Sequence, residues 1–353
     1  WFSRAPYNSL TGASRWNEPC VPVYTTGTSI DTGGQPRESL RTVYGRIDQD
    51  IDRAIELLEK ARETTLAENN KSHINLYVAL GIKSRACLAE GDWDGAFKAA
   101  KRVIDEGGYA VGTKSDLTGG MNSLDKQNVM WGAGIQVADQ AGGYAGFFTH
   151  MDNKEGAYAK SAPKLISKQL YNRISATDIR RDWWDPSDKE SPYVSKKFSF
   201  ANVASFLGDY IYMRVEEMYF TAAEAALRLD DLKSARELMN TVMAERDPGY
   251  SANNRSGTLL GATTTTWTGS FLENILTHRR IELWGEYGRL FDVRRLGQGI
   301  DRRTDDGFSE ECISMMNRRN VNITKADTYD WVLTIPKAEL DANPNINEED
   351  QNP

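Results

Sequence analysis

The sequence predicts a mainly α-helical fold, in which a tetratricopeptide-like helical scaffold carries long loop-rich insertions and a few short strands. Three observations predict this fold class. Apolar residues recur at helical spacing through 42–108, and a similar arrangement of small and large residues returns in 210–246. Two other segments, 109–208 and 247–269, are rich in Gly, Ser, Thr and aromatic residues and show little helical periodicity. We expect all of these segments to form one domain over 1–353.

Composition and charge narrow the class of protein. The chain has 353 residues, of which 40% are hydrophobic and 26% charged, as in ordinary globular proteins. Its net charge of −7 argues against nucleic-acid binding, which needs a basic field. The sequence contains no run of about 18 apolar residues, so it predicts no membrane-spanning helix. Cys20, Cys87 and Cys312 stand far apart, so we expect neither zinc nor a disulfide framework, and we expect Cys87 to be a buried thiol. No cofactor is predicted.

The first helix follows an irregular N-terminal segment. Residues 1–41 are rich in Pro, Gly, Ser and Thr and are predicted to be a loop with a short strand at 21–29. Segment 43–61 is predicted to be an amphipathic helix with an acidic outer face. Its apolar residues recur every three or four positions: Val43, Ile47, Ile51, Ile55 and Leu58.

Two further helices are predicted over 72–91 and 93–108. Ser72 is the expected N-cap of the first of them, Gly91 is expected to end it, and a pair of glycines closes the second. This helix pair has a counterpart 139 positions later. Small residues recur at Ser84 and Ala223, Cys87 and Ala226, and Ala96 and Ala235, and larger ones at Trp93 and Leu232 and at Val103 and Val242. Small residues let two antiparallel helices approach closely, as in tetratricopeptide pairs.

The remaining elements are shorter. Segment 128–138 predicts a strand, 161–174 a helix, and 330–336 a strand near the C-terminus. Ser270 followed by Glu273 predicts a capping box, so a helix is expected to begin there and to continue into the arginine-rich segment.

The arginine-rich segment 277–297 admits three interpretations: a phosphate-binding surface, a catalytic acid, or a structural clamp. Acidic residues alternate with the arginines, whereas a nucleic-acid-binding surface needs Lys or Arg side chains that are not paired with acidic residues. Glu282 and Glu286 share one predicted helix face with arginines, which lowers carboxyl pKa values and so opposes general-acid catalysis. We favour the clamp, with ion pairs at i,i+3 spacing. The pairs expected are Arg279 with Glu282, Glu286 with Arg289, Arg289 with Asp292, and Asp292 with Arg295.

The stretch "RRIELWGEYGRLFDVRRLG" closely resembles the C-terminal signature of the SusD/RagB family of outer-membrane nutrient-binding lipoproteins. Four more stretches agree in order: "PRESLRTVYGRIDQDIDRAIELL", "DIRRDWW", "YMRVEEMYFTAAEAAL" and "IPKAELDANPNINEEDQNP". The matching positions outside the signature are Asp178, Arg180, Arg214, Glu217, Glu224, Ala225, Pro336, Glu339, Asn343 and Pro344. The resemblance covers about 36–353, with 270–353 as the signature region.

This resemblance implies a non-catalytic receptor on the extracellular face of the outer membrane. The receptor would bind an oligo- or polysaccharide and deliver it to a SusC-like TonB-dependent transporter, which would pack against the helical-repeat face. It would contact the membrane only through an N-terminal lipid anchor outside this chain. We expect 42–108 and 210–246 to form the helical scaffold, and 109–208 and 247–269 to form the ligand face.

A glycan receptor needs flat aromatic rings for the C–H faces of sugars and polar groups for the hydroxyls. The ligand-binding candidates are therefore polar and aromatic residues in predicted loops: Tyr144, Phe147, Phe148, His150, Trp183, Trp184 and Trp267. Trp131, Trp93 and Trp284 lie on predicted strands or helices and are assigned to the core. No metal site is predicted, because "DDGFSEE" near Asp305 lacks the spacing of a Ca²⁺ loop.

Two other functions remain open from the residues alone. One is a helical-repeat adaptor or RagB-like receptor that binds peptide or protein on its concave repeat surface. The other is an enzyme that acts on glycans. The long loop-rich insertion between the two repeats favours the glycan receptor.

Overall fold

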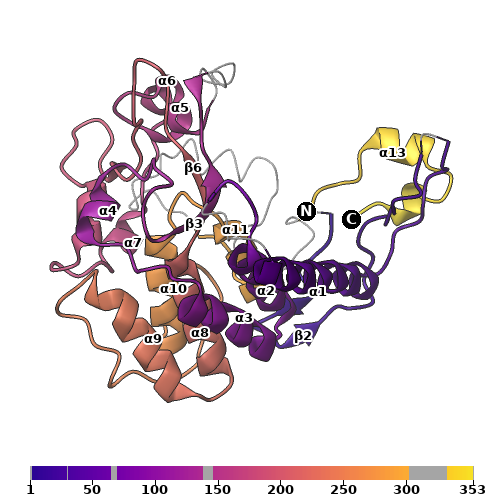
Figure 1. Ribbon diagram of the computed structural model, residues 1–353, viewed down its shortest axis with the longest axis horizontal. Coiled ribbons are helices and arrows are strands. Elements are labelled where there is room, and N and C mark those ends of the chain that lie inside the picture. The colour runs from indigo at the N-terminus through magenta and orange to yellow at the C-terminus, as the bar shows by residue number, and fades with distance from the viewer. Residues whose placement is uncertain (1, 30, 65–69, 138–145, 302–331, 353) are drawn as a thin grey trace.

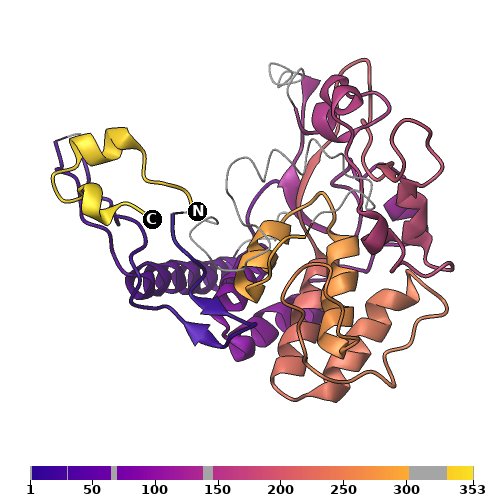
Figure 2. The same cartoon turned by 180° about the vertical axis from the view of Figure 1, so that it is seen from behind.

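A computed structural model of the protein describes residues 2–29, 31–64, 70–137, 146–301 and 332–352. The predicted mainly α-helical class with a few short strands is confirmed. Figure 1 shows three parts: a body of packed helices, a loop-rich part that contains β3, β6 and α4–α7, and a long helix α1. The C-terminal α13 lies beside the N-terminal segment, and Figure 2 shows α8, α9 and α10 at the opposite end of the molecule.

The helices and strands follow one another along the chain with these bounds: β1 Tyr7–Asn8, β2 Ala13–Ser14, α1 Leu40–Thr64, α2 Leu76–Glu90, α3 Trp93–Glu106, α4 Lys114–Thr118, β3 Val129–Ala133, α5 Phe147–Met151, α6 Ala157–Ser161, α7 Lys168–Tyr171, η2 Ile179–Trp183, β4 Trp184–Asp185, β5 Val194–Ser195, β6 Tyr210–Arg214, α8 Val215–Arg228, α9 Leu232–Ala244, α10 Phe271–Glu282, α11 Arg289–Leu296, α13 Lys337–Ala342 and η5 Glu348–Asp350.

The internal repeat corresponds to two helical hairpins, α2–α3 and α8–α9, which stack because α3 packs against α8. The equivalence extends to the caps. Asp92 and Asp231, 139 positions apart, each accept a hydrogen bond of 3.0 Å from the backbone N–H three residues later. The small residues of both copies are buried between the helices, so the repeat marks close helix packing.

Of the two caps predicted for α2, the C-terminal one is confirmed and the N-terminal one is wrong. Gly91 ends α2 with a φ of 77°, as expected. The N-cap is Asn75 rather than Ser72, because the Asn75 side chain accepts a hydrogen bond of 2.9 Å from the Val78 N–H. The Ser72 hydroxyl instead accepts a hydrogen bond from the N–H of Gly134. Cys87 is a buried free thiol, as predicted.

Three other local predictions need correction. The strand predicted at 128–138 exists but is confined to β3, which pairs antiparallel with β6. The segments 21–29 and 332–336 contain no strand among their described residues. The helix predicted over 161–174 is reduced to α7, because Leu165 forms a β-bridge with Val194 and so keeps the chain before α7 extended.

The arginine-rich segment is two helices rather than one. α10 ends at Glu282, and α11 begins at Arg289. Between them Gly285 and Gly288 have φ values of 76° and 112°, a conformation that breaks a helix and suits glycine. Ser270 caps α10 as predicted, but the Glu273 carboxylate accepts from the N–H groups of residues 268 and 269. The turn between α10 and α11 faces the loop-rich part of the molecule.

Candidate functional site

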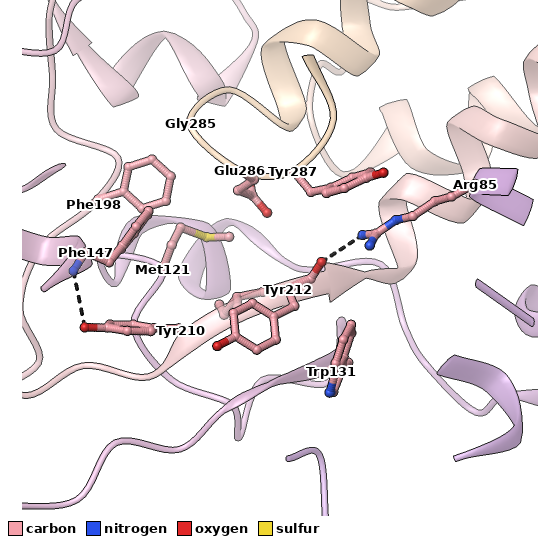
Figure 3. A pocket seen from close by; sticks show the side chains of 11 residues that line it. Arg85, Met121, Trp131, Phe147, Phe198, Tyr210, Tyr212, Gly285, Glu286 and Tyr287 are labelled. Atoms are coloured by element: carbon pink, nitrogen blue, oxygen red, sulfur yellow. Dashed lines mark hydrogen bonds between the residues drawn. The ribbon is translucent and has the colours of Figure 1, made fainter. Parts of the chain in front are cut away.

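A cavity of about 550 Å³ lies where the loop-rich part meets the turn between α10 and α11 (Figure 3). Helices α2 and α5 and strands β3 and β6 contribute to its walls. The loop after α4, the segment between β5 and β6, and the turn between α10 and α11 complete them. Six of the lining residues are aromatic. The lining consists of Arg85, Met121, Trp131, Phe147, Phe198, Tyr210, Ile211, Tyr212, Gly285, Glu286 and Tyr287.

The paired strands β3 and β6 supply one wall. Tyr210 and Tyr212 are two residues apart on β6, so the alternation of a strand brings both rings to the same side. The ring of Trp131 on β3 meets the ring of Tyr212 edge to face, with 5.1 Å between centroids. Tyr212 keeps 40% of its surface exposed, and Trp131 is half-buried. These rings are therefore accessible from the cavity (Figure 3).

Phe147 and Phe198 close the inner end of the cavity. Their rings meet edge to face at 5.3 Å. The backbone N–H of Phe147 donates a hydrogen bond of 3.2 Å to the Tyr210 hydroxyl, which ties α5 to β6. A Cβ atom at Gly285 would lie 2.5 Å from the Phe198 ring, so a glycine is needed for the turn to approach this closely.

Arg85 and Tyr287 form the opposite wall. The Arg85 guanidinium lies over the Tyr287 ring, 3.7 Å from its centroid. The guanidinium also donates two hydrogen bonds to the Glu217 carboxylate, 2.8 Å from Nε and 2.7 Å from Nη2. A third bond of 2.8 Å joins Nη2 to the Tyr212 backbone carbonyl. Tyr287 is 37% exposed, but its ring carries the guanidinium on one face and also stacks on Phe291 with 5.3 Å between centroids. The guanidinium is therefore fixed, and the Tyr287 ring is packed within the protein.

A buried ion network lies behind the cavity and centres on Glu282. This carboxylate forms ion pairs of 2.9 to 3.1 Å with the guanidinium groups of Arg180, Arg214 and Arg246. Arg214 also pairs with Glu286 at 2.7 Å. The network therefore joins η2, β6, the segment after α9, and α10, and it fixes the turn that carries Glu286 into the cavity wall.

The arginines around Glu282 oppose general-acid catalysis by that carboxylate. Burial by itself would raise the pKa of Glu282, but the surrounding guanidiniums of Arg246, Arg214 and Arg180 hold it well below its ordinary value. Burial lowers the pKa of Lys197 to about 8, although Glu286 opposes this shift. Lys197 Nζ donates to the Glu282 and Trp284 carbonyl oxygens and to Glu286 Oε1. These groups stabilise the fold.

The clamp uses other pairs than the predicted ones. Of the four ion pairs expected within one helix, the pair between Asp292 and Arg295 is present, at 2.8 Å. Arg279 reaches Asp292 across the turn at 3.0 Å instead. No ion pair joins Arg289 to any other described residue. The glycine turn explains these differences, because it separates α10 from α11 and so removes the single-helix spacing.

Several predicted ligand-binding residues lie in the core, which corrects the sequence interpretation. Trp183, Trp184 and Phe148 are 3%, 1% and 2% exposed and pack together in a second hydrophobic cluster. The Trp183 indole N–H donates a hydrogen bond of 2.9 Å to the Leu117 carbonyl oxygen. Burial leaves these rings no face for a sugar. Tyr144 lies outside the described residues.

The other predicted residues are partly exposed. Phe147 lines the cavity. His150 stacks on Tyr158 with 4.6 Å between ring centroids, and the Trp267 ring is covered by the Arg173 guanidinium at 3.9 Å. His150 and Trp267 do not line the cavity.

Sequence reasoning missed most of the cavity. Trp131 was assigned to the core, yet it lines the cavity and is only half-buried, because β3 lies at the cavity wall. Trp93 and Trp284, also assigned to the core, are half-buried and pack against core clusters. Two sequence signals could have indicated partly exposed rings. One is the pair Tyr210 and Tyr212 at alternate positions of a strand, and the other is the position of Tyr287 between two glycines.

Within the described ranges, no three His, Cys, Asp or Glu side chains gather closely enough to hold a metal ion. "DDGFSEE" and Cys312 lie outside those ranges. The same residues include no helix with the length and apolar character to cross a membrane.

Comparison with known proteins places these features in context. The model of the SusD family matches residues 151–353. A SusD-like carbohydrate-binding protein from Bacteroides vulgatus is 25% identical, with a TM-score of 0.74 over 95% of this chain and 71% of that one. A SusD superfamily protein from Bacteroides thetaiotaomicron is 23% identical, with a TM-score of 0.74 over 100% and 73%.

A surface glycan-binding protein from Bacteroides uniformis shares the fold at 18% identity, with a TM-score of 0.60 over 96% of this chain and 74% of that one. A search of curated protein sequences found no match.

Proposed function

Since this chain belongs to the SusD family, we propose that it is a non-catalytic receptor on the extracellular face of the outer membrane, which holds an oligo- or polysaccharide in the aromatic cavity. It then delivers this glycan to a SusC-like TonB-dependent transporter. The similar structures described as carbohydrate- or glycan-binding support the ligand class.

The aromatic lining of the cavity carries the proposal. Sugars present flat C–H faces that pack on aromatic rings, while their hydroxyls need polar groups at the ring edges. Trp131 and Tyr212 offer their rings to the cavity, and the Trp131 indole N–H and the hydroxyls of Tyr212 and Tyr287 supply polar groups. The volume of about 550 Å³ falls within the range of small-ligand sites.

The state of the carboxylates supports a binding role without catalysis. Glycoside hydrolysis uses two carboxyl groups that flank the bond, one of them with a raised pKa. Glu286 is the carboxylate in the cavity wall. Burial tends to raise the pKa of Glu286, but Arg214 and Lys197 lower it below its ordinary value, so it favours the ionised form and would be a poor general acid.

We assign the transporter contact to the hairpins α2–α3 and α8–α9. These two hairpins form the helical body of the molecule, next to the loop-rich part that contains β3, β6 and α4–α7 (Figure 1). Pull-down of the transporter with variants of exposed charges on these helices would test this contact.

Affinity electrophoresis against a panel of plant, fungal and host polysaccharides, with product analysis, tests the receptor role. We expect retardation by one class without cleavage. Tyr212→Ala should weaken that retardation by about tenfold, the effect of losing one stacking contact of about 1.4 kcal/mol. Tyr24→Ala is the matched control, because Tyr24 is 46% exposed and does not line the cavity. Equal loss in both variants, or cleavage of the polysaccharide, would contradict the proposal.

A second hollow favours one alternative, a peptide receptor. It measures about 290 Å³ and lies between α1, α2 and α11, where Ile47, Ile51, Ile82 and Phe291 contribute aliphatic and aromatic surface. Arg85, Arg279, Asp292 and Arg295 also line it, so the hollow offers apolar surface for peptide side chains and charged groups for the polar atoms of a peptide. Binding of a peptide library that Phe291→Ala abolishes, with no polysaccharide bound, would support this alternative.

A further inference from the structure

We propose that the glycan held in the cavity is acidic and that the Arg85 guanidinium binds its carboxylate or sulfate group. This inference rests on the proposed receptor function of the same cavity and names the class of its ligand.

The first support is the way Arg85 is held. Nε and Nη2 donate to the two oxygens of Glu217, and Nη2 also donates to the Tyr212 carbonyl. Stacking on Tyr287 fixes the guanidinium plane. These contacts leave Nη1 without a hydrogen bond to any residue that the structure describes. A preoriented guanidinium with a free N–H pair is a donor for an anionic oxygen.

The second support is the state of the other charged group in the wall. Glu286 would repel an anion if its charge were uncompensated. Its Oε1 accepts from Lys197 at 2.5 Å and from Arg214 at 2.8 Å, and its Oε2 accepts from Arg214 at 2.7 Å. The two cations therefore compensate the negative charge of Glu286, and the repulsion between Glu286 and an anionic ligand is weak.

The third support is the charge balance behind Arg85. Glu217 pairs with Arg279 as well as with Arg85, so its negative charge is shared between two guanidiniums. Glu217, Asp292 and Glu224 form ion pairs with Arg85, Arg279 and Arg295, so the charges behind the wall are balanced. Of these three guanidiniums, Arg85 is the one that lines the cavity, so this wall presents a cationic group to an incoming anion.

The remaining polar groups are also suited to oxygen acceptors. The Trp131 indole N–H and the hydroxyls of Tyr212 and Tyr287 line the cavity and have no hydrogen-bond partner in the described part of the chain. An indole N–H can only donate. A ring carrying a carboxylate or a sulfate ester would therefore find both a stacking surface and donors.

Paired ligands test the inference without altering the protein. Binding is measured by calorimetry for a polyuronate and for the same polymer with its carboxyl groups reduced to alcohols. A sulfated polysaccharide and its desulfated form make the second pair. We expect about tenfold or stronger binding of the anionic member of one pair, the ratio for a charge-assisted hydrogen bond. Preference in the second pair only would identify sulfate as the group.

Variants assign the preference to Arg85. Arg85→Met should reduce the ratio of affinities for the anionic and the neutral ligand to about one. Arg85→Lys should keep part of this preference, and Tyr24→Ala should leave it unchanged. Because Arg85 also pairs with buried Glu217, thermal unfolding must first show that both Arg85 variants are folded. If they are not, the paired ligands alone decide.

The outcomes separate this inference from the proposed function. If both members of each pair bind equally well and Tyr212→Ala weakens the binding of both, the acidic ligand is overturned and the receptor role remains intact. Absence of binding to every polysaccharide of the panel and of both pairs overturns both. A preference that survives in a folded Arg85→Met variant overturns the assignment to Arg85.

Discussion

Arg246 donates hydrogen bonds to both carboxylate oxygens of Glu282, 2.9 Å to Oε2 and 3.0 Å to Oε1, and neither side chain is exposed. Arg246 follows α9, and Glu282 is the last residue of α10. The pair therefore joins the helical scaffold to the turn that carries Glu286 and Tyr287 into the cavity wall. Support for the candidate site comes from buried charge rather than from apolar packing alone.

Replacement of Glu282 tests this support. Glu282→Gln leaves the guanidiniums of Arg180, Arg214 and Arg246 buried without their shared carboxylate, which should lower the free energy of unfolding by roughly 3–5 kcal/mol. Urea denaturation followed by circular dichroism measures the change. Glu237→Gln is the control, because Glu237 pairs with Lys233 on the surface at 3.8 Å and should change stability by less than about 1 kcal/mol. Similar stabilities for the two variants would contradict the clamp.

The buried carboxylates also predict how stability depends on pH. Burial would raise the pKa of Asp292, but Arg279 and Arg295 bring it down to about 2. Burial likewise opposes ionisation of Glu282, whose pKa Arg246 and neighbouring arginines hold well below its ordinary value. Because these pKa values are lower in the folded chain than in the unfolded one, their stabilisation is complete above about pH 4.3.

That stabilisation is lost as the pH falls from about 4.3 toward about 2. Urea unfolding at a series of pH values should show a steady decline over this range, and Glu282→Gln should show a shallower decline. A free energy of unfolding that stays constant down to pH 3 would rule out this role for the carboxylates.

Trp183→Ala should destabilise the fold instead of removing a sugar contact. Trp183 is 3% exposed and packs against Trp184 at 5.8 Å. The cavity left by its ring should lower the free energy of unfolding by about 3–5 kcal/mol. The measurement is urea unfolding, with glycan affinity determined on the folded fraction. A stable variant with weakened binding would restore Trp183 as a ligand platform.

Gly285→Ala should strain the turn and narrow the cavity. Gly285 has a φ of 76°, and an added Cβ would lie 2.5 Å from the Phe198 ring. We expect a loss of about 1–3 kcal/mol in the free energy of unfolding, together with weaker glycan binding. Gly45→Ala is the control, because Gly45 lies within α1 and its added methyl meets no atom within 4 Å. That change should stabilise the protein by up to about 1 kcal/mol, and a Gly285→Ala variant that behaves in the same way would contradict the role of the turn.

The sequence alone determined the helical scaffold. The start and the end of a helix depend on residues that are close in sequence. Gly91 therefore correctly predicted the end of α2, and Ser270 correctly predicted the start of α10. The repeat at a spacing of 139 positions predicted two similar helix pairs, because small residues at matching positions are needed wherever two helices approach closely. The stacking of the two pairs through α3 and α8 was decided by the tertiary structure. The family motifs pointed to the correct family, which the match over residues 151–353 confirms.

Only the tertiary structure decided which aromatic residues are exposed. Trp183 and Trp184 have the composition of a surface loop around them, yet they lie in the core, whereas Trp131 on a strand lines the cavity. The site brings together Arg85, Trp131, Tyr212 and Tyr287, which come from four separate segments of the chain. Exposure of a ring depends on what packs over it from distant segments, and local sequence patterns carry no information about that packing.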